Sequence, residues 1–135
     1  MLGVVESIHF FKSNGFKIGL ATSSPNIILN AILDTLKIRD LFDVVTSAEN
    51  LVYGKPHPEV YINTAKDLGV QTTSCIAIED SFNGLLSAKS ARMKTIAVPE
   101  NENRNKTEFM IADIILDNLY SINRNHLDQL SVVLT

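Results

Sequence analysis

The pattern of apolar and polar positions predicts helices and strands in alternation along the chain. Apolar residues three or four positions apart predict an amphipathic helix over residues 2–14. Short apolar runs predict strands at 16–21, 42–45, 74–78, 95–98 and 114–116. Further helices are expected from residue 25, from about 58 to 69, from 81 to about 91, near 110–112 and after 120. The predicted strands are continuous apolar runs, which is typical of parallel strands covered by helices on both faces. We therefore predict an α/β fold with three layers, α/β/α, around a parallel, Rossmann-like sheet.

The segment after the first predicted strand has the sequence of a helix start. Ser24 is expected to be the N-cap residue and Pro25 the first helical residue. The helix that follows is apolar nearly all round, so we expect much of it to be buried. Its apolar residues are Ile27, Ile28, Leu29, Ile32, Leu33 and Leu36.

Length and composition predict one small domain without nucleic-acid or membrane partners. Residues 1–135 are expected to form a single partial domain, with residues 121–135 as a C-terminal tail whose end frays. A net charge of −3 provides no basic surface for nucleic acid or anionic lipid. No apolar run approaches the ~18 residues of a membrane span.

Cys75 is the only cysteine, and its apolar surroundings predict a buried, inert thiol rather than a nucleophile. We expect a cytoplasmic protein, because a lone cysteine forms no internal disulfide and the N-terminus lacks a signal peptide.

Candidate functional residues follow the predicted strands. Ligands of open parallel sheets bind outside the carboxyl ends of the strands. Thr22-Ser23-Ser24 follows the first strand and is either a helix-capping cluster or a phosphate cradle. Lys55, between Gly54 and Pro56, is either a solvated lysine or a cation that neutralises a phosphoryl group. Glu79-Asp80 ends a buried strand. Either Asp80 caps the following helix, or the two carboxylates bind Mg²⁺. One or two protein carboxylates are enough for a Mg²⁺ site.

Three local strings together resemble the haloacid dehalogenase superfamily of phosphotransferases. They are residues 19–24, 53–61 and 77–84, with the sequences Gly-Leu-Ala-Thr-Ser-Ser, Tyr-Gly-Lys-Pro-His-Pro-Glu-Val-Tyr and Ala-Ile-Glu-Asp-Ser-Phe-Asn-Gly. They are similar to the branch that contains β-phosphoglucomutase and the 2-deoxyglucose-6-phosphate or hexitol phosphatases. The resemblance extends from residue 1 to about residue 130. It implies a Mg²⁺-dependent enzyme whose partner is a small phosphorylated sugar.

The resemblance also implies a role for each candidate residue. The Thr22 hydroxyl would hydrogen-bond the transferring phosphoryl group beside the Ser23 backbone, and Lys55 would bridge the phosphoryl oxygens and the nucleophile. Glu79 and Asp80 would hold Mg²⁺, directly or through water. Asn26 falls where some relatives contact phosphate.

One part of the family pattern is absent. In the family an aspartate attacks phosphorus, and a second aspartate two residues on acts as acid and base. This chain contains no Asp-x-Asp motif. The region that carries it in the family also carries the helical cap that sets specificity. We therefore expect an incomplete Mg²⁺ site and negligible phosphatase activity from this chain alone. Three functions stay open: part of a sugar-phosphate phosphatase, part of a β-phosphoglucomutase, and a non-catalytic phosphate-binding or interaction module.

The resemblance further implies a missing central strand. In the family it lies between the strand that ends at Thr22 and the strand that ends at Glu79. Without it, two inner strand edges are left unpaired. Three arrangements would resolve this: the two strands pair directly, a second copy supplies a strand in a homodimer or by strand exchange, or the chain is a fragment of a longer protein.

Overall fold

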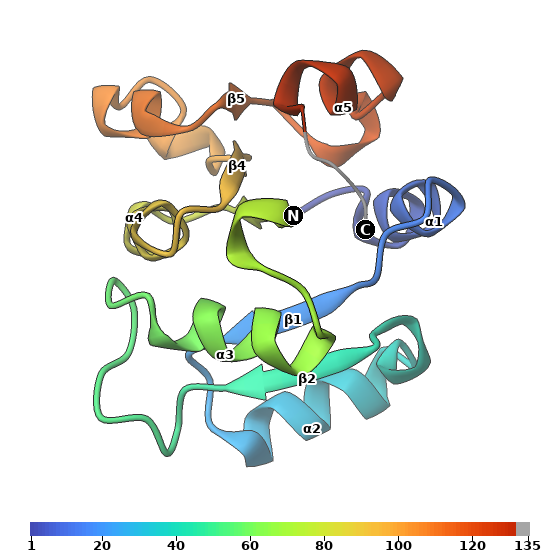
Figure 1. The fold of residues 1–135 in the computed structure, drawn as a ribbon, viewed down its shortest axis with the longest axis vertical. Helices are drawn as coiled ribbons and strands as arrows, with labels where there is room; N and C mark the ends of the chain where they lie inside the picture. The colour runs from blue at the N-terminus through green and yellow to red at the C-terminus, as the bar shows by residue number, and fades with distance from the viewer. Residues whose placement is uncertain (132–135) are drawn as a thin grey trace.

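The computed structural model describes residues 1–131 as a chain of alternating helices and strands (Figure 1). Its regular elements are α1 (Val4–Ser13), β1 (Gly19–Thr22), α2 (Asn26–Thr35), β2 (Val44–Ser47), α3 (Glu59–Leu68), β3 (Ile76–Glu79), α4 (Phe82–Ser90), β4 (Lys94–Ala97), β5 (Ile114–Ile115) and α5 (Arg124–Leu130). A short 3-10 turn also forms at Thr107–Ile111, near the helix expected at 110–112. The predicted fraying of the tail falls on residues 132–135, outside the described residues.

The strands form two separate parallel sheets. β1 pairs with β2, with Gly19 opposite Val44, while β3, β4 and β5 pair in that order. Figure 1 shows the β1–β2 sheet in the lower part of the view and β4 and β5 in the upper part. The expectation that the strands ending at Thr22 and Glu79 pair directly is therefore wrong. α3 packs on β1 and β2, and α4 packs on β3 and β4.

Two buried apolar clusters lie on opposite faces of the strands. The first contains Val60 and Ala65 of α3, Ala88 of α4 and Ala77 of β3. The second joins elements from both ends of the chain, and its buried members are Phe11, Ile96, Val98, Ile114, Leu119 and Leu130. Helices thus cover both faces of parallel strands, which confirms the predicted three-layer α/β/α fold.

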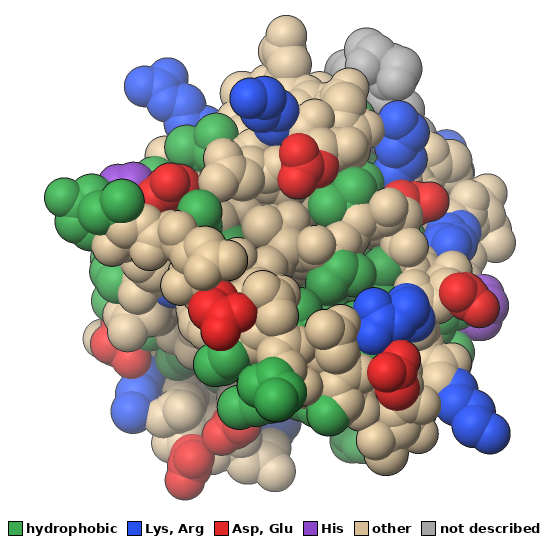
Figure 2. All heavy atoms as spheres, turned by 90° about the horizontal axis from the view of Figure 1, so that it is seen from below, with side chains coloured by type: hydrophobic (Ala, Val, Ile, Leu, Met, Phe, Trp, Pro, Cys, Tyr) green, Lys and Arg blue, Asp and Glu red, His purple; other side chains and the backbone are tan. Residues whose placement is uncertain are grey.

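The predicted start and burial of α2 are wrong. Pro25, not Ser24, occupies the N-cap position, and no side chain caps this helix. Only Leu29 and Leu33 of α2 are buried, whereas Ile27 is 79% exposed. The helix packs with a single face, because no further layer covers its outer side. α2 lies at the bottom of the view in Figure 1, and Figure 2 shows the molecule from that side. Hydrophobic side chains on this face are scattered among charged ones.

Other local predictions are confirmed. α3 ends at Gly69, whose φ of 74° is the left-handed conformation that favours glycine. Ser81 caps α4 by accepting a hydrogen bond from the Gly84 backbone N–H. β1, β2 and β3 begin two or three residues later than expected. Phe16 and Ile18, which were expected in the first strand, pack in the second cluster. No helix among residues 1–131 has both the length and the apolarity to cross a membrane.

A polar link fastens β5 to β4. The Asp113 carboxylate accepts hydrogen bonds from the Thr95 backbone N–H (2.8 Å) and the Thr95 hydroxyl (3.1 Å), and it pairs with Lys89 at 3.1 Å. Burial alone would raise the pKa of Asp113, but these hydrogen bonds and the Lys89 charge outweigh it and lower that pKa below its ordinary value of 3.8. The ionised form of Asp113 therefore stabilises the edge of this sheet.

Candidate functional site

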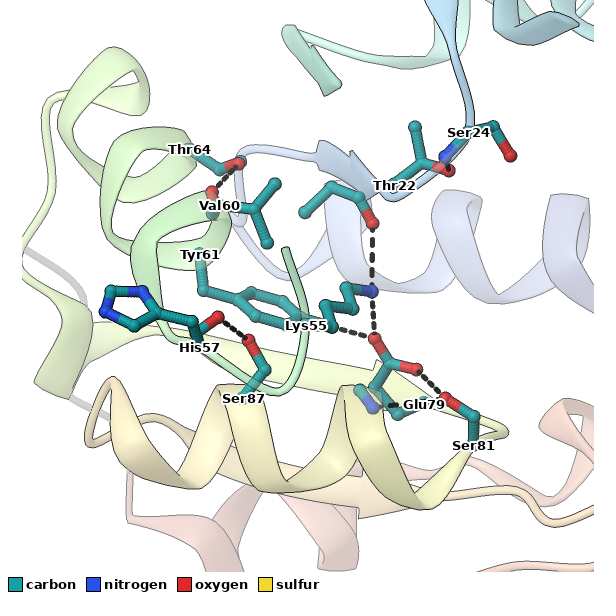
Figure 3. Close-up of polar contacts among 12 residues, drawn as sticks. Thr22, Ser24, Lys55, His57, Val60, Tyr61, Thr64, Glu79, Ser81 and Ser87 are labelled. Carbon is teal, nitrogen blue, oxygen red and sulfur yellow. Dashed lines mark hydrogen bonds and ion pairs between the residues drawn. The ribbon is translucent and has the colours of Figure 1, made fainter. Parts of the chain in front are cut away.

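The Lys55 ammonium lies between the carboxyl ends of β1 and β3. It donates hydrogen bonds to the Ala21 backbone oxygen at 3.3 Å and to Glu79 Oε1 at 2.5 Å (Figure 3). The Lys55 side chain is 13% exposed and that of Glu79 is 8% exposed, so the pair is largely removed from water. Lys55 lies in a turn closed by a hydrogen bond from the His57 backbone N–H to the Gly54 oxygen, and the Lys55–Pro56 peptide bond is cis. Lys55 is therefore an inward-facing lysine rather than a solvated one.

Glu79 is held by a second donor, the Tyr61 hydroxyl, which donates to the same oxygen as Lys55. Tyr61 comes from α3, and its ring centroid lies 5.0 Å from the Lys55 nitrogen. Burial raises the pKa of the Tyr61 hydroxyl well above its ordinary value of 10.0, and the neighbouring Glu79 charge raises it further. Tyr61 therefore stays a neutral donor, and the buried Glu79 carboxylate accepts hydrogen bonds from it and from Lys55.

The other Glu79 oxygen lies against the start of α4. The Ser81 hydroxyl is 3.5 Å from Glu79 Oε2, and a Cβ atom on residue 84 would overlap the Glu79 carboxylate. Only glycine fits at this position while Glu79 keeps its place. Tyr61 and Gly84 are therefore two site residues that the sequence analysis did not assign. The spacing of Tyr61 predicts only that it faces inward, and nothing in the sequence indicates what Gly84 contacts.

Thr22 ends β1 on the same side of the sheet as Glu79. Its hydroxyl oxygen accepts a hydrogen bond from the Ser24 backbone N–H at 3.1 Å, as a local turn. The hydroxyl proton has no acceptor among the described residues and is available to a ligand. Ser23 is exposed beside it. Because the Lys55 ammonium donates to the oxygen of Ala21, the residue before Thr22, the structure places Lys55 beside the end of β1.

Asn26 is engaged elsewhere. Its backbone N–H and its side-chain amide both donate to Glu49 Oε2, at 3.1 Å and 2.8 Å. A carboxylate therefore already occupies the N-terminus of α2, where an anion is favoured. Glu49 must move before Asn26 and this helix end can hold phosphate.

His57 lies near Lys55 in sequence but turns away from Glu79. Its ring stacks on Tyr53 with a centroid distance of 4.9 Å, and its Nδ1 accepts from the Glu59 backbone N–H. The Ser87 hydroxyl donates to the His57 backbone oxygen at 2.7 Å, which ties the Lys55 turn to α4 (Figure 3). The histidine therefore helps to fix the turn.

The carboxylates fit part of a Mg²⁺ site. Asp80 is half-buried, and within residues 1–131 its carboxylate takes part in no hydrogen bond or ion pair, so it is free to bind a cation. Oε1 of Glu79 already accepts hydrogen bonds from Lys55 and Tyr61. No group of three or more His, Cys, Asp or Glu side chains within residues 1–131 is arranged to hold a metal. Two carboxylates suffice for Mg²⁺ only when water or other groups complete its coordination.

Cys75 lies away from these residues. It is partly buried, its thiol donates to the Gln71 backbone oxygen at 3.3 Å, and burial raises the pKa of the thiol from its ordinary value of 9.0. A raised pKa lowers the fraction of reactive thiolate. The thiol thus has the properties of an inert residue, although it is less buried than expected.

Comparison with known proteins identifies the relatives of this chain. Residues 1–92 match the family described as haloacid dehalogenase-like hydrolase. Hexitol phosphatase B of Escherichia coli is 44% identical over 117 residues, which cover 87% of this chain and 53% of that protein. The crystal structure of β-phosphoglucomutase from Clostridium difficile superposes with a TM-score of 0.80 at 32% identity, covering 95% of this chain and 54% of that one. CbbY of Rhodobacter sphaeroides in complex with phosphate superposes with a TM-score of 0.83 at 28% identity, over 94% and 58%.

These matches confirm the resemblance drawn from the three sequence strings. The chain spans about half the length of the relatives it matches. The family match includes Thr22, Lys55, Glu79 and Asp80, and the fold superposes over nearly the whole chain. The chain therefore belongs to the haloacid dehalogenase-like hydrolases.

Proposed function

We propose that this chain provides the phosphate-binding and acidic half of a Mg²⁺-dependent phosphatase of small sugar phosphates. The observation that carries this proposal is the Lys55 ammonium, held at the joint carboxyl ends of β1 and β3 by Ala21 and Glu79. Such a lysine is fixed in place before a ligand arrives, which is the form of electrostatic stabilisation that contributes most to catalysis. The whole reaction is phosphomonoester hydrolysis through an aspartyl-phosphate.

Each polar residue has a distinct task in this proposal. Lys55 neutralises charge on the phosphoryl oxygens, and the Thr22 hydroxyl and Ser23 backbone N–H hydrogen-bond the same group. Glu79 and Tyr61 hold the lysine in position, because Lys55 and the Tyr61 hydroxyl both donate to Oε1 of Glu79. Asn26 joins the phosphate contacts only when Glu49 releases it.

Asp80 is the residue best placed to bind Mg²⁺ directly, since Glu79 is engaged by Lys55 and Tyr61. Glu79 then acts on the ion through water, as Mg²⁺ usually retains several waters. When bound, Mg²⁺ would neutralise charge on the transferring phosphoryl group. The remaining ligands and the nucleophile come from outside these 135 residues, so this chain alone has negligible activity.

The substrate class follows from the relatives. Hexitol phosphatase B is named for a phosphorylated sugar alcohol, and one structural relative is described in complex with phosphate. A net charge of −3 and a single inward lysine suit a small anion rather than nucleic acid. We place this chemistry in the cytoplasm, where a lone cysteine stays reduced.

A second candidate is part of a β-phosphoglucomutase, favoured by the superposition on that enzyme over 95% of this chain. The two activities share the site described above, and they differ in whether the phosphoryl group passes to water or to a sugar. A third candidate, a non-catalytic phosphate-binding module, is favoured by the lack of an Asp-x-Asp motif.

Titration of the folded chain with inorganic phosphate, followed by backbone amide chemical shifts, tests the proposal. Shifts are expected at Thr22, Ser23 and Lys55, and addition of Mg²⁺ should shift Asp80. Thr22→Val keeps the side-chain size and should weaken phosphate binding several-fold, while Lys89→Met removes a lysine elsewhere and should not. Equal binding by wild type and Thr22→Val would refute the assigned phosphate site. Mg²⁺-dependent turnover of a hexose phosphate by this chain would refute its predicted inactivity.

A further inference from the structure

The turn that follows β2 lies against the turn that follows β1. The two strands are parallel neighbours, so the chain leaves both of them at the same edge of the sheet (Figure 1). The turn after β1, residues 22–26, contains Thr22 and Ser23, the proposed phosphate contacts. We call residues 22–26 the phosphate loop. We call residues 47–49, which end β2 and follow it, the clamp segment.

Two hydrogen bonds join the clamp segment to the first part of the phosphate loop. The Ala48 backbone N–H donates to the Thr22 oxygen at 2.9 Å, and the Ser47 hydroxyl donates to the Ser24 oxygen at 2.6 Å. Ala48 is itself buried in the first apolar cluster. The phosphate loop is therefore attached to a segment that the core already fixes.

Glu49 holds the other end of the phosphate loop. The backbone N–H and the side-chain amide of Asn26 both donate to Glu49 Oε2, at 3.1 Å and 2.8 Å. Glu49 is positioned in turn, because its backbone N–H donates to the Ser47 hydroxyl oxygen at 3.1 Å. No lysine or arginine side chain within residues 1–131 forms an ion pair with Glu49. Asn26 and the N-terminus of α2 are therefore what stabilise this carboxylate.

These hydrogen bonds decide which polar groups of the phosphate loop stay available to a ligand. The carbonyls of Thr22 and Ser24, which would repel an anion, are turned toward the clamp segment. The Ser24 backbone N–H is used within the loop, since it donates to the Thr22 hydroxyl oxygen. The Thr22 hydroxyl proton and the Ser23 backbone N–H have no acceptor within residues 1–131. The clamped loop thus presents donors to an anion.

We propose that Ser47 and Glu49 are positioning residues of the phosphate site, a role that rests on the phosphate-binding function proposed above. Neither residue contacts phosphate. They hold the phosphate loop in the conformation that leaves the Thr22 hydroxyl proton and the Ser23 N–H free for the ligand. Asn26 stays bound to Glu49 while phosphate binds. A loop that is ordered in advance strengthens binding, because no ordering cost is incurred when the ligand arrives.

Charge and position predict opposite effects for Glu49. A carboxylate near an anion site repels the anion, by about fivefold in affinity for two unit charges about 4 Å apart in water. If Glu49 acted only through its charge, or competed with phosphate for Asn26, its removal would strengthen phosphate binding. The positioning role predicts weaker binding, because loss of the acceptor releases Asn26 and loosens the loop.

Inorganic phosphate binding to the 135-residue chain, followed by backbone amide shifts at Thr22 and Ser23, tests this role. Glu49→Ala removes the charge and the acceptor, and it should weaken binding about fivefold. Glu49→Gln removes the charge but keeps an oxygen that accepts from Asn26, so it should bind phosphate at least as tightly as wild type. Amide exchange without phosphate gives an independent measure. The Asn26 N–H should exchange at least about fivefold faster in Glu49→Ala than in Glu49→Gln.

Ser47→Ala tests the other half of the clamp segment. It removes the bond to the Ser24 oxygen and the acceptor of the Glu49 N–H, and it should also weaken phosphate binding about fivefold. Ser7→Ala is the matched control, because the Ser7 hydroxyl also donates to a backbone oxygen, that of Val4 in α1, at 2.8 Å. Both serine variants should lose similar stability in urea, and only Ser47→Ala should lose phosphate affinity.

Each contrary result has a distinct meaning. Tighter phosphate binding by Glu49→Ala than by wild type would overturn the positioning role and make Glu49 a competitor of the ligand. Equal loss of affinity in Glu49→Gln and Glu49→Ala would overturn it too, because the loop would then not depend on the acceptor. Unchanged binding by Glu49→Ala and Ser47→Ala, or unchanged Asn26 exchange in Glu49→Ala, would refute the clamp alone. Absence of phosphate-induced shifts in wild type would instead refute the proposed phosphate site.

Discussion

Gly84 provides the sharpest test of how the candidate site is built. The residue lies in α4 with ordinary helical backbone, so alanine is allowed there on conformational grounds. Its Cβ would overlap the Glu79 carboxylate, which Lys55 and Tyr61 hold from the other side. Gly84→Ala therefore forces Glu79 out of place and separates it from both donors.

The expected magnitude is the balance of two opposing effects. Replacement of glycine by alanine inside a helix stabilises a protein by up to about 1 kcal/mol. Separation of a buried ion pair costs about 3–5 kcal/mol when one charge is left without its partner. The displaced carboxylate recovers some hydration through the neighbouring cavity, so we expect a net loss of about 2 kcal/mol in the free energy of unfolding.

Urea denaturation followed by circular dichroism measures this loss. A slope of about 1–3 kcal/mol/M predicts that the unfolding midpoint falls by about 1 M. Gly54→Ala is the matched control: a Cβ there meets nothing within 4 Å, so its midpoint should hardly change. In a Glu79→Ala background, Gly84→Ala should cost nothing or stabilise. An unchanged or higher midpoint for Gly84→Ala in the wild-type background would refute this account of the site.

Three further predictions concern the charges and the hydroxyl. Lys55→Met should lower the free energy of unfolding by about 3 kcal/mol in the same urea assay, because Glu79 stays buried without its cation. Lys89→Met is the control: its ion pair with Asp113 is more exposed, so this variant should lose less than about 1 kcal/mol. Ultraviolet absorbance titration should show one tyrosine that ionises well above pH 10, and Tyr61→Phe should remove that step. The lowered pKa of Asp113 stabilises the fold above the unfolded-state value of about 3.9, and this stabilisation is lost as pH falls through the folded-state pKa. Asp113→Asn should therefore flatten the decline of the unfolding midpoint below about pH 4, and a decline as steep as in wild type would contradict the assignment.

The order and type of the elements could be predicted from the sequence because local signals agree with the tertiary structure. Gly69 and Ser81 end and begin helices for reasons contained in their own chemistry. α2 could not be predicted as well. Its apolar residues surround the helix, and sequence periodicity does not show whether a second layer covers the outer face. Ile27 lies exposed because this sheet has a helix layer on that side and nothing beyond it.

The site residues at the ends of predicted strands could be predicted from the sequence. Thr22 and Glu79 were expected together because ligands of parallel sheets bind outside the carboxyl ends of the strands. The bonds from Lys55 to Ala21 and Glu79 show that the ends of β1 and β3 lie together although the two strands belong to separate sheets. The roles of Tyr61 and Gly84 depend on how α3 and α4 pack around one carboxylate. The separation of residues along the chain contains no information on that packing.

The same lysine joins the two sheets and faces the proposed phosphate. Between β1 and β3 the described residues form no strand pairing, and Lys55 connects Ala21 of one sheet to Glu79 of the other. The ammonium has three N–H donors and uses two of them for these bonds, so the third can donate to a phosphate while the connection between the sheets is kept.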